Sequence, residues 1–164
     1  MPLLEVVPSP ETAPWVVLQT EAFWKTRGRE PVVIHKEMTG FVANRLAFAL
    51  LREAVHLVKE GVVSVEEVDK IVTGSMGPRW AVWGPFKSYH AGGGSGGLEA
   101  FFENIGGTIQ KCWNDAGREN VGERWEQDIF WQCEDSFGKE DTVIRDLATE
   151  SVLKAARTLL DGSE

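Results

Sequence analysis

The stretch FVANRLAFALLREAVHLVKE, residues 41–60, decides the predicted fold. Its polar residues recur at helical spacing along one narrow stripe, which consists of Arg45, Arg52, Glu53, His56, Lys59 and Glu60. Apolar residues fill almost every other position, and a helix with so narrow a polar stripe is buried on more than one side. The stretch therefore predicts a long helix inside an α-helical domain, with His56 on its solvated stripe.

Asn44 is the exception within this predicted helix. It projects roughly 100° away from the polar stripe on a helical wheel of 100° per residue. A polar amide in apolar surroundings must find a hydrogen-bond partner there. Asn44 is therefore a candidate either for a functional site or for a buried contact that fixes helix packing.

The segments on either side extend the helical prediction. Short β-branched runs at residues 3–7 and 31–35 predict two strands, with a helix between them at residues 12–27. Beyond the long helix, Ser64 and Glu67 form a capping-box pattern that opens another helix. Helical periodicity then returns in three segments, residues 98–116, 121–137 and 141–160. Because two strands alone cannot make a stable sheet, the fold class predicted is mainly α with one or two short N-terminal strands.

Two glycine-rich stretches interrupt the helices. Residues 77–86, GPRWAVWGPF, hold too much glycine and proline for one regular element and predict a structured aromatic turn. Residues 92–97, GGGSGG, formally satisfy the dinucleotide pattern G-x-G-x-x-G. That pattern needs a preceding strand and a βαβ unit, whereas this one enters a helical region. We expect a turn at this place rather than a nucleotide site.

Composition limits the partners. The chain is 43% hydrophobic and 26% charged, as is ordinary for a soluble globular domain. A net charge of −8 opposes nucleic acid, and no long apolar stretch predicts a membrane span. The N-terminus carries no basic, apolar leader, so we expect a cytoplasmic protein. Two cysteines and three scattered histidines predict neither a disulfide framework nor a metal site.

Four runs, in their order and spacing, carry a family resemblance: LLEVVPSPET, TGFVANRLAFALLREAVHLVKEGVVSVEEVDK, MGPRWAVWGPF and AGGGSGGLEAFF. Together they resemble the 3-hydroxyacyl-CoA dehydrogenase family. Within it they are most similar to the branch that contains λ-crystallin, L-gulonate 3-dehydrogenase and L-carnitine dehydrogenase. The resemblance covers residues 3–102 well and the remainder loosely.

The resemblance implies a division of the chain. Residues 36–164 would form a helical domain like the C-terminal domain of 6-phosphogluconate dehydrogenase, which in the family completes the substrate cleft and makes the homodimer. Residues 1–35 would be a strand–helix–strand remnant of the junction with an N-terminal Rossmann domain that binds NAD. We therefore expect a homodimer with a small-molecule substrate, and NAD only if a Rossmann domain is supplied elsewhere.

The resemblance also implies site residues. Glu5 falls on the glutamate that orients and polarises the family's catalytic histidine, and Asn44 falls on the asparagine of the motif G-F-x-x-N-R in the active site. The turn that walls the substrate pocket corresponds to Gly84, Pro85 and Phe86, and we add Phe41, Trp80 and Trp83 to that wall. The catalytic histidine's place lies upstream of Met1, which leaves His90 as the histidine of interest. The alternatives are an unpartnered Glu5 at a sheet edge, an Asn44 that only fixes packing, and aromatic side chains that belong to the core.

These residues lead to three functional hypotheses. A methionine just before PLLEV looks like a native start, so we favour a naturally short, cofactor-free enzyme acting on a β-keto or β-hydroxy acyl or polyketide-like compound. It would use acid/base chemistry (proton transfer, dehydration or cyclisation), with Glu5 or His90 as the base and Asn44 as a donor to an enolate oxygen. One alternative is the isolated C-terminal domain of an NAD-dependent dehydrogenase. The other is a non-catalytic, dimeric ligand-binding protein.

Overall fold

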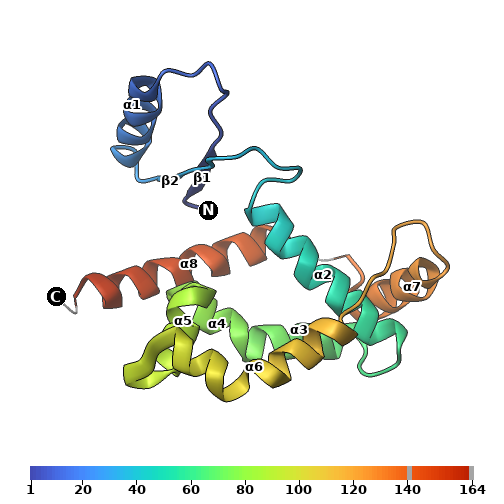
Figure 1. Ribbon diagram of the computed structural model, residues 1–164. Coiled ribbons are helices and arrows are strands. Elements are labelled where there is room, and N and C mark those ends of the chain that lie inside the picture. Colours follow the sequence, from blue (N-terminus) through green and yellow to red (C-terminus); the bar gives the residue numbers. More distant parts are fainter. Residues whose placement is uncertain (140–141, 163–164) are drawn as a thin grey trace. The chain divides into compact units, whose positions relative to one another are not determined.

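The computed structural model describes residues 1–139 and 142–162, and its described part is mainly α-helical, as predicted (Figure 1). The chain divides into two compact units, Met1–Leu51 and Arg52–Glu164. The long helix α2 (Ala43–Lys59) begins in the first unit and ends in the second.

The first unit contains the predicted strand–helix–strand segment. Strands β1 (Leu3–Val6) and β2 (Glu30–Val33) pair in parallel, with Glu5 opposite Val32. Helix α1 (Pro14–Lys25) connects them and packs against β2. Proline suits the first helical turn because its missing N–H has no intrahelical partner there. The two strands are thus confirmed, and they form a two-stranded sheet within the described residues.

Helix α2 ends in a glycine cap. The N–H of Gly61 donates to the carbonyl of Val58, and the N–H of Val62 donates to the carbonyl of Leu57, each at 2.9 Å. Gly61 has a φ of +69°, a left-handed conformation that glycine adopts without strain. This pair of bonds is the Schellman arrangement, which satisfies carbonyls that the helix itself leaves unpaired.

The second unit opens with the predicted capping box. Ser64 and Glu67 exchange the two expected hydrogen bonds at the start of α3 (Val65–Gly74). The turn predicted at residues 77–86 is instead mostly helical: α4 (Met76–Val82) and α5 (Pro85–Gly92) are separated by Trp83 and Gly84. The glycine interrupts the helix and Pro85 starts the next one at a position that tolerates proline, so two short helices replace the turn.

The remaining elements are the short 3₁₀ helix η1 (Gly94–Gly96) and three longer helices: α6 (Gly97–Asp115), α7 (Trp125–Phe137) and α8 (Thr142–Asp161). Helix α5 packs against α6, α3 against α7, and α4 against α8. No described helix is long and apolar enough to cross a membrane.

The buried core of the described residues is small. Its apolar members are Ile34, Val55, Val58 and Val65. Helix α2 therefore does not match the expectation of burial on several sides: it buries Val55 and Val58 near its C-terminal end, whereas Phe48 is 61% exposed. The apolar side chains nearer its N-terminal end lack cover among the described residues of their own unit.

Candidate functional site

Glu5 lies at the N-terminal end of α2. Its Oε1 accepts hydrogen bonds from the backbone N–H of Val42 at 2.8 Å and of Ala43 at 3.2 Å. The first amides of a helix have no partner inside the helix, and the helix N-terminus attracts negative charge. The half-buried carboxylate of β1 therefore caps α2 and links the strand to the helix. Glu5 is not without a partner, as a carboxylate at a bare sheet edge would be.

An unusual turn aims these two amides at Glu5. Gly40 has a φ of +77° and the next residue, Phe41, has a φ of +50°. Phe41 is the one described residue other than glycine with a positive φ, and such a conformation strains a bulky side chain. Strain of this kind occurs at functional sites, where the surrounding structure holds it in place. The turn thus marks the entrance of α2 as a candidate site.

Asn44 follows directly on the two amides that Glu5 binds. Its side chain is exposed and makes no hydrogen bond to any residue within 1–139 or 142–162. The expectation that Asn44 sits in apolar surroundings with a local partner is therefore wrong for the described chain, because no element of its unit covers this side of α2. The carboxylate of Glu5 and an available amide of Asn44 consequently lie at the same helix end, beside Phe41.

The predicted aromatic wall belongs to the second unit. Trp80, Trp83 and Phe86 lie on or between α4 and α5, and all three are exposed, Phe86 by 78%. They are therefore not core residues of the described chain. The ammonium group of Lys87 lies 4.6 Å from the centre of the Trp83 ring, a cation–π contact. Gly84 and Pro85 form the break that starts α5.

His90 accepts a hydrogen bond from the start of α6. Its Nδ1 accepts a hydrogen bond from the N–H of Leu98 at 3.2 Å, so a neutral ring carries its proton on Nε2. A Cβ on Gly97 would lie 2.5 Å from Cε1 of His90, and Gly97 has a φ of +61°. The glycine run therefore lets α6 begin against the histidine ring. It follows helix α5 rather than a strand, so it does not fit a dinucleotide pyrophosphate.

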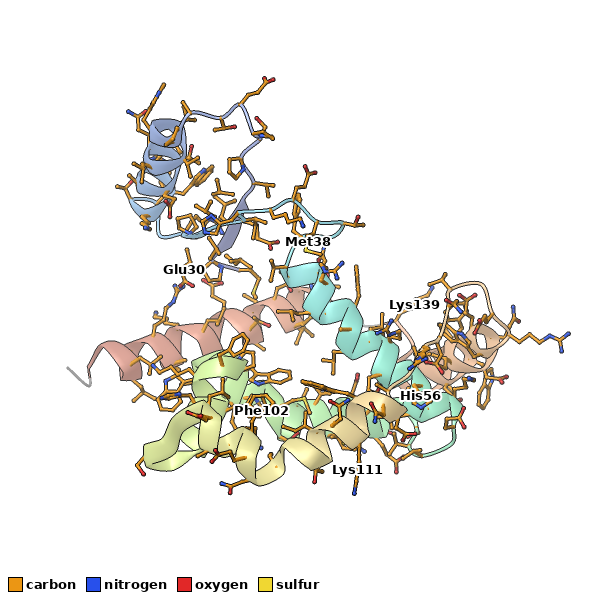
Figure 2. The ribbon with its side chains drawn as sticks, in the orientation of Figure 1. Glu30, Met38, His56, Phe102, Lys111 and Lys139 are labelled. Atoms are coloured by element: carbon orange, nitrogen blue, oxygen red, sulfur yellow. The ribbon has the colours of Figure 1, made fainter. Side chains whose placement is uncertain are left out.

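A second polar cluster was not found from the sequence. His56 Nδ1 donates to Oε1 of Glu119 at 2.9 Å, and the ammonium of Lys59 donates to the same oxygen at 3.2 Å. The N–H of Gly117 donates to Oε2 of Glu53 at 2.9 Å. We call Glu53, His56, Lys59, Gly117 and Glu119 the loop cluster, because it joins α2 to the loop between α6 and α7. Figure 2 shows His56 near the C-terminal end of α2.

The electrostatics of the loop cluster centre on Glu119. Its side chain is 5% exposed, and its hydrogen bond with His56 is the main cause that lowers its pKa from 4.5 to about 2. The same bond raises the pKa of His56, against the opposing effect of partial burial. His56, which we predicted to be solvated, is 24% exposed and paired. Its partner is 63 residues away in sequence, and helical periodicity carries no signal for so distant a contact.

Comparison with known proteins places this arrangement in a family. The profile described as 3-hydroxyacyl-CoA dehydrogenase, C-terminal domain, matches residues 40–130, which is more than half of the chain. This chain belongs to the 3-hydroxyacyl-CoA dehydrogenase family. The matched residues run from the turn before α2 into α7, so they include Asn44, the aromatic segment, His90 and the loop cluster. The family resemblance inferred from the four sequence runs is thus confirmed.

Individual relatives agree with the family. The chain is 35% identical over 134 residues to an L-carnitine dehydrogenase from Oceanobacillus iheyensis, covering 82% of this chain and 44% of the relative. It is 32% identical over 162 residues to the L-carnitine dehydrogenase of Pseudomonas syringae pv. syringae, covering 96% and 51%. A 3-hydroxyacyl-CoA dehydrogenase from Gibberella moniliformis is 40% identical over 117 residues, covering 70% and 36%.

A solved structure shows the same fold. It is the NAD+ dependent dismutase 5-formyl-3-hydroxy-2-methylpyridine 4-carboxylic acid 5-dehydrogenase, with a TM-score of 0.68 and 25% identity. The alignment covers 98% of this chain and 52% of that one. The chain therefore spans about half the length, or less, of the relatives that it matches.

Proposed function

We propose that this chain is an enzyme that binds a β-keto or β-hydroxy acyl compound and catalyses acid/base chemistry on it without a bound cofactor. The observation that carries the proposal is the geometry at the entrance of α2, where the carboxylate of Glu5 is fixed by two backbone amides beside the available amide of Asn44. Membership of the 3-hydroxyacyl-CoA dehydrogenase family supports the class of substrate.

The proposed chemistry assigns one role to each group. The amides of Val42 and Ala43 hold Oε1 of Glu5, and the other oxygen of that carboxylate takes a proton from the carbon next to the substrate carbonyl. The electron pair of the broken C–H bond moves to the carbonyl oxygen, which Asn44 stabilises with a hydrogen bond. Return of a proton completes an exchange reaction. Loss of the β-hydroxyl group as hydroxide, which the protonated Glu5 neutralises to water, completes a dehydration.

His90 suits this scheme less well as the base. Its Nδ1 is occupied by the N–H of Leu98, and the Nε2 of the neutral ring carries the proton. That nitrogen could donate a hydrogen bond but could not take a proton. We therefore assign the base to Glu5, and we place Phe41, which lies in the same unit, beside the acyl group.

We also propose a homodimer in the cytoplasm as the working form. Phe48 of α2 and Trp131 of α7 are each more than 60% exposed, and soluble proteins normally cover large apolar side chains of this kind. A second copy would supply that cover. Light scattering at micromolar concentration is expected to give twice the 18.2 kDa mass of one chain. A mass of one chain would contradict the dimer.

The lengths of the relatives favour a second candidate function. The chain spans 44% of one L-carnitine dehydrogenase and 51% of another, so it could be the substrate-binding half of an oxidoreductase. In that case it would bind substrate, and a nucleotide-binding half would supply the NAD that takes the hydride. The described residues contain no strand-linked glycine loop for that cofactor.

Deuterium incorporation distinguishes the two candidates. The chain is incubated with 3-hydroxybutyryl-CoA in D₂O, and NMR follows both deuterium at C2 and formation of crotonyl-CoA. The proposal predicts catalysed exchange that Glu5→Gln abolishes and Asn44→Ala lowers at least tenfold, whereas the exposed carboxylate variant Glu99→Gln retains it. Calorimetric binding of the compound without exchange above the buffer rate would reject the acid/base enzyme and support the binding half.

A further inference from the structure

The loop between α6 and α7 is hydrogen-bonded both to α2 and to the first turn of α7. On one side the loop cluster fastens it to α2 through Glu53, His56 and Lys59, which are spaced three residues apart and so lie along one face of the helix. On the other side, Nε1 of Trp125 donates to the carbonyl of Asn120 at 3.1 Å. The position of the first turn of α7 therefore depends on the loop.

Helix α7 packs against α3, and it also comes near the C-terminal end of α2. A hollow lies between them, lined on α2 by Val58 and Lys59 and on α7 by Trp125, Ile129 and Trp131. Lys59 thus takes part in two contacts, because its ammonium donates to Glu119 while its side chain lines the hollow. Lys59 therefore connects the loop cluster with the hollow beside α7.

Glu119 makes the attachment sensitive to charge. Oε1 receives both cationic donors, whereas the buried Oε2 has no hydrogen-bond partner in the part of the chain that the structure describes. A buried carboxylate that is only partly satisfied is costly unless opposite charge stays beside it. A Cβ on Gly117 would lie 2.5 Å from this Oε2 and would also overlap His56, so the packing around the carboxylate leaves little room for adjustment.

The charged groups around His56 come from three elements. Glu53 and Lys59 lie on its own helix and Glu60 directly follows that helix, Glu119 comes from the loop, and Asp128 of α7 lines the hollow next to Lys59. The hydrogen bond to Glu119 is the largest cause that raises the pKa of His56, and the charges of Glu119, Glu53 and Glu60 act in the same direction. These carboxylates together favour a protonated His56.

We propose that the loop cluster is a proton-operated clamp, which holds the loop before α7 on α2 while His56 is charged and loosens that loop, and with it the start of α7, when His56 loses its proton. A group whose pKa is raised on folding contributes fully to stability below its unfolded pKa, which is 6.5 for His56. That contribution to stability is lost as the pH rises through the folded pKa. The carboxylate of Glu119 stays charged down to about pH 2. The clamp is therefore tight in mildly acidic solution and loose in alkaline solution, independently of the chemistry proposed at Glu5.

Hydrogen exchange measured by mass spectrometry tests the clamp. Protection of peptides from α7 is compared with that of α6 in the same full-length protein between pH 5.5 and pH 9, after correction for the intrinsic exchange rate. We expect the protection of α7 relative to α6 to fall several-fold as the pH rises. In His56→Gln, whose neutral amide can still donate to Glu119, the protection of α7 is expected to equal the alkaline wild-type value at every pH.

A variant in an ion pair outside the loop cluster serves as the control. Lys70 and Glu66 form an exposed i,i+4 ion pair on α3 at 2.8 Å, and Lys70→Met removes one cation without touching the loop cluster. This variant should keep the wild-type pH dependence, whereas Lys59→Met should lower the protection of α7 at all pH values. The clamp is rejected if wild-type α7 protection does not change with pH, or if His56→Gln retains the same pH dependence.

Discussion

The two ends of α2 each bind a carboxylate, but they do so with different groups. At the N-terminal end, Glu5 is held by the backbone amides of Val42 and Ala43. Towards the C-terminal end, Glu119 is held by the side chains of His56 and Lys59. Backbone amides do not titrate, whereas an imidazole gains and loses its proton near neutral pH. The first contact is therefore a fixed support for chemistry, and the second is one that pH can adjust.

Adding a side chain at Gly117, in the contact near the C-terminal end of α2, should have the largest effect on stability. In Gly117→Ala, the new Cβ would overlap His56 and lie 2.5 Å from Oε2 of Glu119, so we expect a loss of about 1–3 kcal/mol in the free energy of unfolding. Urea denaturation monitored by circular dichroism gives the value. Gly107→Ala in α6 is the control, because nothing lies within 4 Å of its Cβ and alanine favours a helix. An unchanged stability in Gly117→Ala would show that the loop does not pack as described.

Removal of the charge at Glu119 should cost less and should depend on pH. We expect Glu119→Gln to lose about 1–2 kcal/mol at pH 6, because the amide oxygen still accepts a hydrogen bond and only the assistance of the charge is lost. The loss should shrink towards pH 9, because His56 loses its proton as the pH rises through its raised pKa, whereas the ion pair between Lys59 and Glu119 remains. Urea denaturation at both pH values measures the difference. An equal loss at pH 6 and pH 9 would contradict the role of His56.

The equivalent change at the other end should not depend on pH over the same range. Glu5→Ala removes the cap from the amides of Val42 and Ala43, which should cost about 1 kcal/mol, the usual scale for a helix N-cap. Because those donors do not titrate, the loss should be the same at pH 6 and pH 9 in urea denaturation. A loss that changes between these pH values would remove the contrast between the two ends.

Relief of strain at the entrance of α2 should have the smallest effect. Phe41 adopts a φ of +50°, which asparagine tolerates better than phenylalanine. We expect Phe41→Asn to raise the free energy of unfolding by up to about 1 kcal/mol. The loss of the ring's apolar contacts would reduce this gain. Thermal unfolding would detect the gain. If the variant is instead strongly destabilised, the ring rather than the backbone determines the stability of this turn.

The sequence predicted the elements better than the contacts between them. Helical periodicity located α2, and the capping box at Ser64 and Glu67 located the start of α3, because both signals are local. The break at Gly84 and Pro85 was also visible, but a proline that interrupts one helix and begins another produces the same local pattern as a turn. That ambiguity explains why α4 and α5 were not predicted.

The residues of the candidate site were identified from the family resemblance, whereas the contacts between them could not be predicted from the sequence. Glu5 and Asn44 were proposed from family motifs, but the bond from Val42 to Glu5 spans 37 residues and the bond from His56 to Glu119 spans 63. Contacts over such distances depend on how the elements pack, which periodicity does not encode. His56 was assigned to solvent because its stripe is polar, and a polar stripe is equally compatible with a partner loop.

One measurement compares the two ends of α2 most directly. The backbone amides of Val42 and Ala43 donate to Glu5, and the amide of Gly117 donates to Glu53 within the loop cluster, so all three are bound by carboxylates. NMR hydrogen exchange can follow each amide between pH 5.5 and pH 9, corrected for intrinsic rates. We predict constant protection at Val42 and Ala43 and falling protection at Gly117 as the pH rises. Protection that falls equally at all three amides, or at none of them, would contradict the account.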